Sequence, residues 1–300
     1  MKKSIIETHI KKYLDEMLTI GNLSETSVYN RRFELNRFYS FCLENNINDV
    51  DKISKNSIVR YLSGLRVSKS TKKTILAVLA SFLDYLNNEG VVIDNVAYSI
   101  KPPKTSPRPP DHLTTQEIKN LFETEKLISP PLFVDRNLLI YSLLFYLCLR
   151  INELVNLKLS DVRIDGDRKE IWVTRKGGFI MALGLNEFLV KRFENWFAAR
   201  KQFKGCDSDW VFLSKRGNRI AVRSARAVVE NGIKKTGIVK NKNGPHVLRH
   251  SGASYYSKLG KDPRKIQFLM GHKNIHTTMR YLHFDSQELT EMIDSCPEII

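Results

Sequence analysis

The chain has 300 residues, of which 42% are apolar, and its 48 Lys and Arg outnumber its 32 Asp and Glu to give a formal net charge of +16. That length exceeds what one compact core usually takes, so we expect two domains. The positive surplus is present in residues 1–110 and again in residues 111–300, which indicates a polyanionic partner. Nucleic acid is the first candidate, and an anionic membrane surface is the second.

Secretion, membrane insertion and a local zinc knuckle do not fit the sequence. The N-terminus has no apolar segment of signal-peptide length, and the most apolar run, residues 137–149, is too short to cross a bilayer. The four cysteines lie far apart with no CxxC pair, as is typical of reduced thiols. We therefore expect a cytoplasmic protein with no membrane partner.

Residues 1–100 have the pattern of four short amphipathic helices. Apolar residues recur at near-helical spacing, and Ser24 and Ser54 can cap the second and third helices. A fourth helix runs through Leu76 and stops near Gly90. We expect these helices to form a small bundle.

Residues 101–112, "KPPKTSPRPPDH", mark the predicted domain boundary. Five of these twelve residues are proline, so the stretch can neither continue a helix nor pair in a sheet. We expect an extended, stiff linker here, and a long loop within one domain is the alternative.

Residues 113–300 predict a second, mostly helical domain with one small sheet. Thr114 and Glu117 form a capping box at its first helix, and residues 137–149 predict a buried helix. Alternating apolar residues between 161 and 185 indicate a three-stranded antiparallel meander, after which helices resume. The predicted fold class is therefore mainly α.

The run "PHVLRHSGAS" places His246, Arg249 and His250 within just over one helical turn. The two histidines could share a metal ion, but Val247 stands where helical metalloproteases need a Glu and Arg249 would repel a dication, so we expect no metal. His246 and Arg249 share a helix face and can reach one phosphate, with help from free backbone N–H groups if the helix begins at the proline. A surface His and Arg at a helix start is the alternative.

Three further motifs accompany this run. The stretch "LMGHKNIHTTMRYLHF" places His272 after a Gly and Tyr281 nine residues later. Upstream, "LCLRINELVNLKLSDV" places Glu153 three residues after Arg150, and "VTRKGGF" contains Lys176. In their order, and over nearly the full chain, these motifs resemble those of the tyrosine recombinases, the phage integrase and Xer group.

The resemblance implies an organisation and a reaction. Residues 1–100 would be a helical, SAM-like core-binding domain that clasps DNA, residues 101–112 a linker, and residues 113–300 the catalytic domain. The enzyme would cut and rejoin DNA at specific sites without metal, ATP or another cofactor, through a 3′-phosphotyrosyl intermediate and a Holliday junction. Its partner would be a double-stranded recombination site, which implies a nucleoid-associated protein.

The resemblance also implies which residues act. The implied catalytic set is Arg150, Lys176, His246, Arg249, His272 and the nucleophile Tyr281. Arg150 and Arg249 would clamp the non-bridging oxygens of the scissile phosphate. Glu153 would fix the local helix beside Arg150, and His250 would support the helix that carries His246 and Arg249.

Two departures from the family pattern are present. Cys148 stands where the family often has Gly, and Phe179 and Met181 stand where basic residues are common in the hairpin. Neither departure removes a catalytic group. Arg175, beside the lysine, cannot replace it as an acid because an arginine pKa stays far above neutral.

A second basic region predicts DNA contacts. Residues 215–237 carry seven basic residues and one Glu, and a helix over 222–235 would present Arg223 and Arg226 one turn apart, as suits the major groove or its phosphates. The full predicted DNA-binding set is Arg175, Arg219, Arg223, Arg226, Lys234 and Lys235. A merely solvated basic face is the alternative.

The resemblance further implies a homotetramer on synapsed DNA. Residues 285–300 would form a C-terminal helix that packs into a neighbouring subunit, and a free tail or a self-docked helix is the alternative. The rival activities are a type IB topoisomerase, a telomere-resolving enzyme, a conjugative-transposon integrase, a non-catalytic DNA-binding regulator and a metal-dependent nuclease. The sequence leaves open the DNA site and the choice among chromosome-dimer resolution, element movement and inversion.

Overall fold

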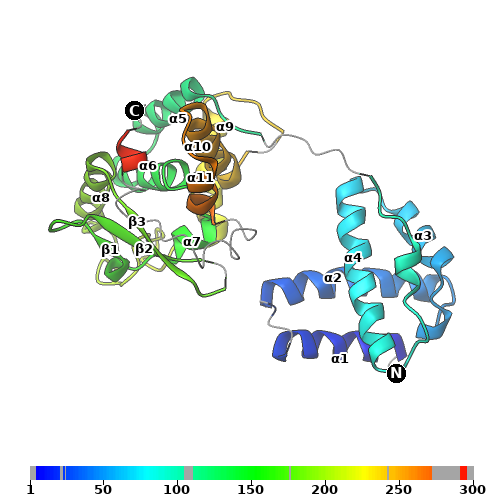
Figure 1. Cartoon of the computed structure of the whole chain (residues 1–300). Coiled ribbons are helices and arrows are strands. Elements are labelled where there is room, and N and C mark those ends of the chain that lie inside the picture. The colour runs from blue at the N-terminus through cyan, green and yellow to red at the C-terminus, as the bar shows by residue number, and fades with distance from the viewer. Residues whose placement is uncertain are drawn as a thin grey trace. The chain divides into compact units, whose positions relative to one another are not determined.

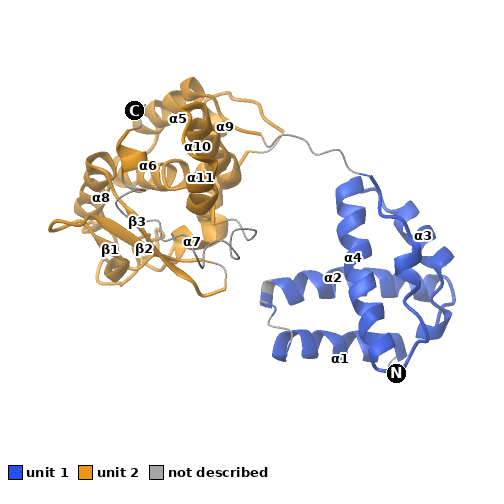
Figure 2. Ribbon diagram, viewed as in Figure 1, with its two compact units in different colours: residues 1–108 blue, residues 109–300 orange. Residues whose placement is uncertain are grey.

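The computed structural model describes residues 5–20, 23, 25–104, 111–175, 177–241, 243–271 and 291–295. The chain divides into two compact units, Met1–Arg108 and Pro109–Ile300, each with its own hydrophobic core (Figure 2). The division falls within the proline-rich stretch 101–112. Most described residues are helical, and they include one small three-stranded antiparallel sheet, which confirms the predicted fold class (Figure 1).

The first unit is a helical bundle (Figure 1). Its elements are α1 (Ile5–Thr19), α2 (Glu25–Glu44), the 3₁₀ helix η1 (Val50–Lys52), α3 (Lys55–Gly64), α4 (Lys69–Asn88) and the 3₁₀ helix η2 (Val96–Ser99). Helix α1 packs on α2, and both contact α4. Ser54 caps α3, as predicted, because its hydroxyl accepts a hydrogen bond from Ser57 N at 3.2 Å. The other predicted cap, Ser24, lies outside the described residues.

The second unit is built around α6. Its elements in chain order are α5 (Thr115–Ile128), α6 (Pro131–Phe145), α7 (Ile151–Val155), the 3₁₀ helix η3 (Leu159–Asp161), β1 (Val162–Arg163), β2 (Glu170–Thr174), β3 (Ile180–Gly184), α8 (Glu187–Arg200), α9 (Val222–Lys235), α10 (Pro245–Lys258) and α11 (Pro263–Met270). Helix α6 contacts α5, α7, α8, α9 and α10, and its residues from Leu138 onward are almost fully buried. The predicted capping box of α5 is confirmed: Glu117 N donates to Thr114 Oγ1 at 3.2 Å, and Thr114 N donates to Glu117 Oε2 at 2.8 Å.

The prediction of one helix over 137–149 is wrong at both ends. Helix α6 begins at Pro131, because a proline fits the first turn of a helix, and it ends at Phe145. Cys148 then adopts a φ of +48°, a left-handed conformation that glycine takes at least cost. This turn explains why a glycine is common here in the family that the sequence resembles, and it brings Arg150 to the start of α7.

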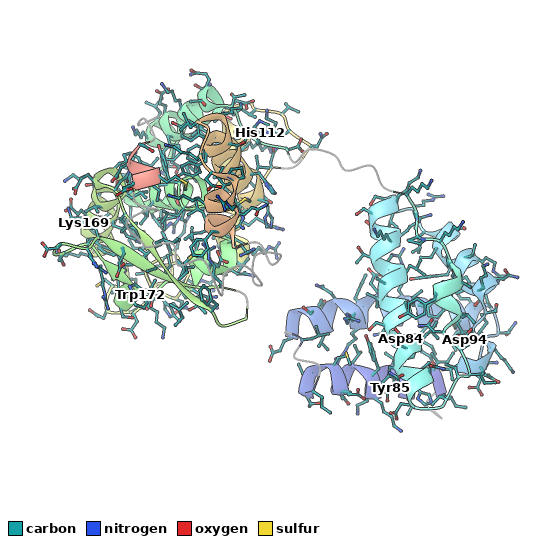
Figure 3. All side chains as sticks on the ribbon, in the orientation of Figure 1. Asp84, Tyr85, Asp94, His112, Lys169 and Trp172 are labelled. Carbon is teal, nitrogen blue, oxygen red and sulfur yellow. The ribbon has the colours of Figure 1, made fainter. Side chains whose placement is uncertain are left out.

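The sheet has the predicted antiparallel order β1–β2–β3. Along β2, Ile171 and Val173 are buried, whereas Trp172 is 39% exposed and lies on the outer face, where Figure 3 labels it. The turn between β2 and β3 is closed by Arg175 N, which donates to Phe179 O at 2.7 Å. The alternation along β2 therefore points the side chains at odd positions into the core of the second unit.

The described part of the predicted C-terminal helix packs on its own unit. In the described C-terminal segment, residues 291–295, Met292 and Ile293 are buried in the core of their own unit. This docking corresponds to the self-docked alternative, and the residues on either side of the segment lie outside the described ones.

Among the helices that the structure describes, none is long and apolar enough to span a bilayer.

Candidate active site

Arg150 and Glu153 form the first part of the site, at the start of α7. Arg150 is the residue before the helix, and its backbone N donates to Glu153 Oε2 at 2.7 Å. Its guanidinium Nη1 donates to Glu153 Oε1 at 2.8 Å, and the Arg150 side chain remains 31% exposed. One carboxylate thus satisfies a free N–H at the helix start and orients the arginine at the same time.

Arg249 forms the second part. Helix α10 begins at Pro245, as predicted, and presents Arg249 from its first turns into the interior, where only 3% of the residue is exposed. Its Nη1 donates to Cys148 O and its Nη2 to Met270 O. His246, on the same helix, is exposed, and His250 is half-buried. The carbonyl of the left-handed residue Cys148 is therefore part of the support of this arginine.

Arg175 corrects a prediction. The sequence placed it among the DNA-binding residues, but it is 5% exposed and points inward, because it continues the buried odd positions of β2. Its Nη1 donates to Glu153 Oε2 at 2.6 Å, and its Nη2 donates to Leu269 O at 2.8 Å. With its guanidinium enclosed in this way, Arg175 has no surface to offer to a DNA groove.

Backbone carbonyls at the end of α11 accept hydrogen bonds from all three arginines. Leu269 O accepts from Arg175, Met270 O from Arg249, and Gly271 O from Arg150 Nη2 at 2.7 Å. These carbonyls lie at the negative end of the helix dipole, where cations are stabilised. Gly271 has a φ of +57°, and a Cβ there would lie 3.2 Å from Arg150 Nη1, so glycine permits this close approach.

The cluster carries an excess of positive charge. Among the described residues, three arginines, Arg150, Arg175 and Arg249, lie around one carboxylate, that of Glu153, which leaves two positive charges unbalanced within this part of the chain. Burial, and then repulsion from Arg150, lowers the pKa of Arg249 to about 10, and burial also lowers the pKa of Arg175. Both groups stay charged at neutral pH. An unbalanced cation pair in a poorly solvated place favours an anionic ligand and opposes a dication.

Several predicted residues lie outside the described ones. Lys176 follows Arg175 directly in the sequence, His272 follows Gly271 directly, and Tyr281 lies further along. The described residues contain no group of three His, Cys, Asp or Glu side chains that could hold a metal ion.

The predicted DNA-binding residues of α9 divide between two faces. Arg223, Arg226 and Lys234 are exposed and share one face, because eleven residues make about three turns. Lys235 is rotated by about 100° from Lys234 and lines a different surface. Arg219, before the helix, is exposed, donates to Asn156 Oδ1, and lies over the Trp210 ring at 5.0 Å from its centroid.

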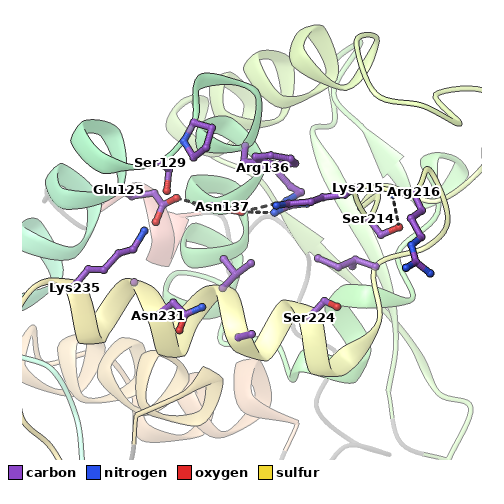
Figure 4. Close-up of a pocket in the computed structure, with 16 residues that line it drawn as sticks. Glu125, Ser129, Arg136, Asn137, Ser214, Lys215, Arg216, Ser224, Asn231 and Lys235 are labelled. Carbon is purple, nitrogen blue, oxygen red and sulfur yellow. Dashed lines mark hydrogen bonds between the residues drawn. The ribbon is translucent and has the colours of Figure 1, made fainter.

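The surface that Lys235 lines is a pocket of about 610 Å³ between α5, α6, α9 and the 214–216 loop (Figure 4). A buried polar network forms part of its wall. Asn137 Nδ2 donates to Glu125 Oε1 at 2.6 Å, while Arg136 Nε and Nη2 donate to Asn137 Oδ1 at 3.1 and 3.0 Å. Tyr141 Oη donates to Glu125 Oε2 at 2.7 Å. The sequence pattern did not predict this network. The one local indication of it was a charged residue, Arg136, within an otherwise apolar helix.

Comparisons with known proteins agree with this fold and identify the family. Residues 111–288 match the family model described as "Phage integrase family", and residues 10–90 match "Phage integrase, N-terminal SAM-like domain". The chain is 30% identical over 297 residues to "Tyrosine recombinase XerC" of Escherichia coli O157:H7 (strain EC4115 / EHEC), covering 97% of this chain and 96% of that one. It is 32% identical over 265 residues to the XerC of Caldanaerobacter subterraneus subsp. tengcongensis, covering 85% and 73%.

Two solved structures share the fold. The XerH site-specific recombinase bound to its difH substrate has a TM-score of 0.70 at 22% identity, covering 95% of this chain and 94% of that one. A lambda integrase dimer bound to a COC′ core site has a TM-score of 0.72 at 17% identity, covering 94% and 79%.

The fold, the site and these relatives define an enzyme that cuts and rejoins DNA strands, a tyrosine recombinase by class. The chain belongs to the phage integrase family. The resemblance inferred from the sequence motifs is thereby confirmed, and none of the matches described favours a topoisomerase, a telomere-resolving enzyme or a regulator without catalysis.

Proposed function

We propose that this chain recombines specific double-stranded DNA sites and that its arginine cluster binds the scissile phosphate. The observation that carries the proposal is the excess of two positive charges around Glu153, built from Arg150, Arg175 and Arg249. A phosphodiester is an anion whose two non-bridging oxygens match arginine donors, and its negative charge rises towards the transition state. Arg150, with its partly exposed side chain, and Arg249 are the two that clamp these oxygens. Because both Nη atoms of the buried Arg249 donate to backbone carbonyls, its guanidinium has to exchange one of these hydrogen bonds for a phosphate oxygen when DNA binds.

The reaction then follows from the residues in their proposed roles. The Tyr281 oxygen attacks the phosphorus, and the bond from phosphorus to the 5′ oxygen breaks. His246 helps to accept the tyrosine proton, Lys176 protonates the leaving 5′ oxygen, and His272 donates a hydrogen bond to the phosphate. The product is a 3′-phosphotyrosyl link and a free 5′ hydroxyl.

Rejoining reverses the step with a 5′ hydroxyl from a second strand. Because the phosphotyrosyl link keeps the bond energy, the cycle needs no ATP, and because arginines and a lysine supply the charge and the proton, it needs no metal. Two rounds of strand exchange pass through a Holliday junction.

DNA binding in this proposal uses the exposed face of α9 and both units. Arg223, Arg226 and Lys234 contact the major groove or its phosphates, and Arg219 contacts the adjacent backbone, while Lys235, on the other face of α9, adds positive charge near the duplex. The basic residues of the first unit clasp the duplex, and the linker joins the two halves. Affinity should fall steeply with salt because each neutralised phosphate releases counterions.

The assembly is proposed as a homotetramer on two synapsed sites, in the cytoplasm and on the nucleoid. A lambda integrase tetramer has been solved bound to a Holliday junction, with a TM-score of 0.69 to this chain at 19% identity. Met292 and Ile293 pack into a core that every copy presents identically, so the same segment can dock on a neighbour. We propose that it does so in the synapse.

Trapping of a covalent adduct tests the proposed function. The protein is incubated in EDTA with nicked duplexes from its own genomic neighbourhood, and an SDS-resistant protein–DNA band is sought. The band should disappear in Tyr281→Phe and persist in Tyr255→Phe, a matched control whose ring packs on Phe145 at 5.5 Å. A band that survives Tyr281→Phe would show that another nucleophile acts, and tight binding without any band would favour a regulator.

A further inference from the structure

Arg175 takes no direct part in the proposed reaction, yet its side chain connects two parts of the catalytic cluster. Its guanidinium donates to Glu153 Oε2 at 2.6 Å and to Leu269 O at 2.8 Å. The planar fork of an arginine holds two acceptors at a fixed separation, which a lysine cannot do. The α7 region and the end of α11 are therefore tied together through one buried side chain.

The first tie acts on Arg150. Glu153 accepts hydrogen bonds from Arg150 N, Arg150 Nη1 and Arg175 Nη1. Because two guanidinium groups share the Glu153 carboxylate, the positive charge of Arg150 is only partly neutralised by its ion pair with Glu153. Without Arg175, the same carboxylate would belong to Arg150 alone, and the excess charge of the cluster would fall from two to one.

The second tie acts on the backbone at two places. Arg175 N and O close the β2–β3 turn with Phe179 O at 2.7 Å and Gly178 N at 3.1 Å. At the other end, Arg175 holds Leu269 O, next to the carbonyls that accept from Arg249 and Arg150. In the chain, Lys176 directly follows Arg175 and His272 directly follows Gly271, and both of these preceding residues are held by hydrogen bonds.

We propose that Arg175 is a positioning residue, which keeps Arg150 available to the phosphate and fixes the β2–β3 turn against the end of α11. The proposal rests on the proposed function, in which Arg150 clamps the scissile phosphate. It differs from a DNA-contact role, because Arg175 then affects the chemical step and leaves DNA affinity alone. Displacing a reacting group by about 1 Å costs about 100-fold in rate, which sets the size of the expected effect.

The first measurement is binding. The dissociation constant on a recombination-site duplex is followed against salt for wild type, Arg175→Gln, Arg175→Lys and the control Arg163→Gln, an exposed arginine of the same sheet. Each direct phosphate contact contributes about 0.9 to the slope of log affinity against log salt. We expect the slope of both Arg175 variants to equal that of wild type. A slope lower by about one in Arg175→Gln would overturn the proposal in favour of a direct contact.

The second measurement is single-turnover formation of the covalent adduct at saturating protein. Arg175→Gln should be about 100-fold slower than wild type, Arg175→Lys about tenfold slower, and Arg163→Gln unchanged. A scissile methylphosphonate replaces one charged oxygen by a methyl group, so it needs less of the charge that Arg150 supplies. On that substrate the deficit of Arg175→Gln should shrink to less than about tenfold.

The outcomes separate the two proposals. If wild type forms the adduct and both variants match its rate, the positioning role is overturned and the proposed function stands. An equal deficit on both substrates would show that Arg175 does not act through the charge of Arg150, and would overturn that part of the proposal. If Arg175→Gln does not fold, Arg175→Lys decides, because it keeps the charge and most of the volume. If wild type binds DNA and never forms the adduct, the proposed function fails, and the positioning role fails with it.

Discussion

The catalytic unit contains two buried networks of charged side chains that differ in their balance. Around Arg136, one arginine and the carboxylate of Glu125 are joined through Asn137, so the network is neutral and its donors and acceptors are paired. Around Glu153, two arginines, Arg150 and Arg175, share the one carboxylate that the described residues supply, and Arg249 adds a third buried positive charge close by. A balanced buried network is what stability alone requires, whereas an unbalanced one costs stability unless a ligand completes it. The charge count therefore separates the candidate site from the structural network.

The largest effect is expected from removing a cation of the unbalanced cluster. Arg249→Gln should slow covalent adduct formation by about 10³-fold, because it removes a preorganised donor from the developing charge of the phosphate. The rate is measured in a single turnover on a nicked duplex, with the exposed Arg264→Gln of α11 as control. A loss below about tenfold would mean that the excess charge serves another purpose.

The balanced network should respond in stability. Arg136→Met leaves the buried carboxylate of Glu125 without its cation and should lower the free energy of unfolding by about 3 to 5 kcal/mol. Adduct formation by the folded protein should stay at the wild-type rate. Urea unfolding measures the change, and the double variant Arg136→Met/Glu125→Gln should recover most of it. No recovery would show that the two residues do not act as a pair.

A steric contact tests how tightly the same network is held. A Cβ at Gly232 on α9 would overlap the hydroxyl of Tyr141, which donates to Glu125. Gly232→Ala should therefore destabilise the unit by about 2 kcal/mol, although alanine favours a helix. Adding Tyr141→Phe makes room, so the double variant should lose less than the sum of the single losses. Strict additivity in thermal unfolding would contradict this coupling.

The smallest effect is expected at the support of Arg249. Cys148 has a φ of +48°, so Cys148→Gly should relieve backbone strain. This gain offsets the loss of the buried side chain, so stability should change by at most about 1 kcal/mol, and the carbonyl that Arg249 binds is kept. Adduct formation should be unchanged. A marked loss of rate would show that the thiol itself is needed.

Burial raises the pKa of the Cys148 thiol to about 12, so in the native protein at pH 8 this thiol should resist alkylation that modifies the less buried Cys206.

Local patterns in the sequence predicted much of the fold. The capping box at Thr114, the start of α10 at Pro245 and the strands between 161 and 185 are all found in the structure. The motif order also predicted the family. The burial of Arg175 could have been inferred as well, because it stands at the next odd position after the buried Ile171 and Val173.

The sequence by itself determined the helices, the caps, the alternation of β2 and the identity of the arginines, since each depends on residues within a few positions of one another. Only the tertiary structure decided that Arg150, Arg175 and Arg249 meet the carbonyls of residues 269–271 around one Glu153. It also decided that the apolar run ends its helix at Phe145. The physical reason is that net charge and solvation at a buried point are sums over segments far apart in the chain, and folding alone brings those segments together.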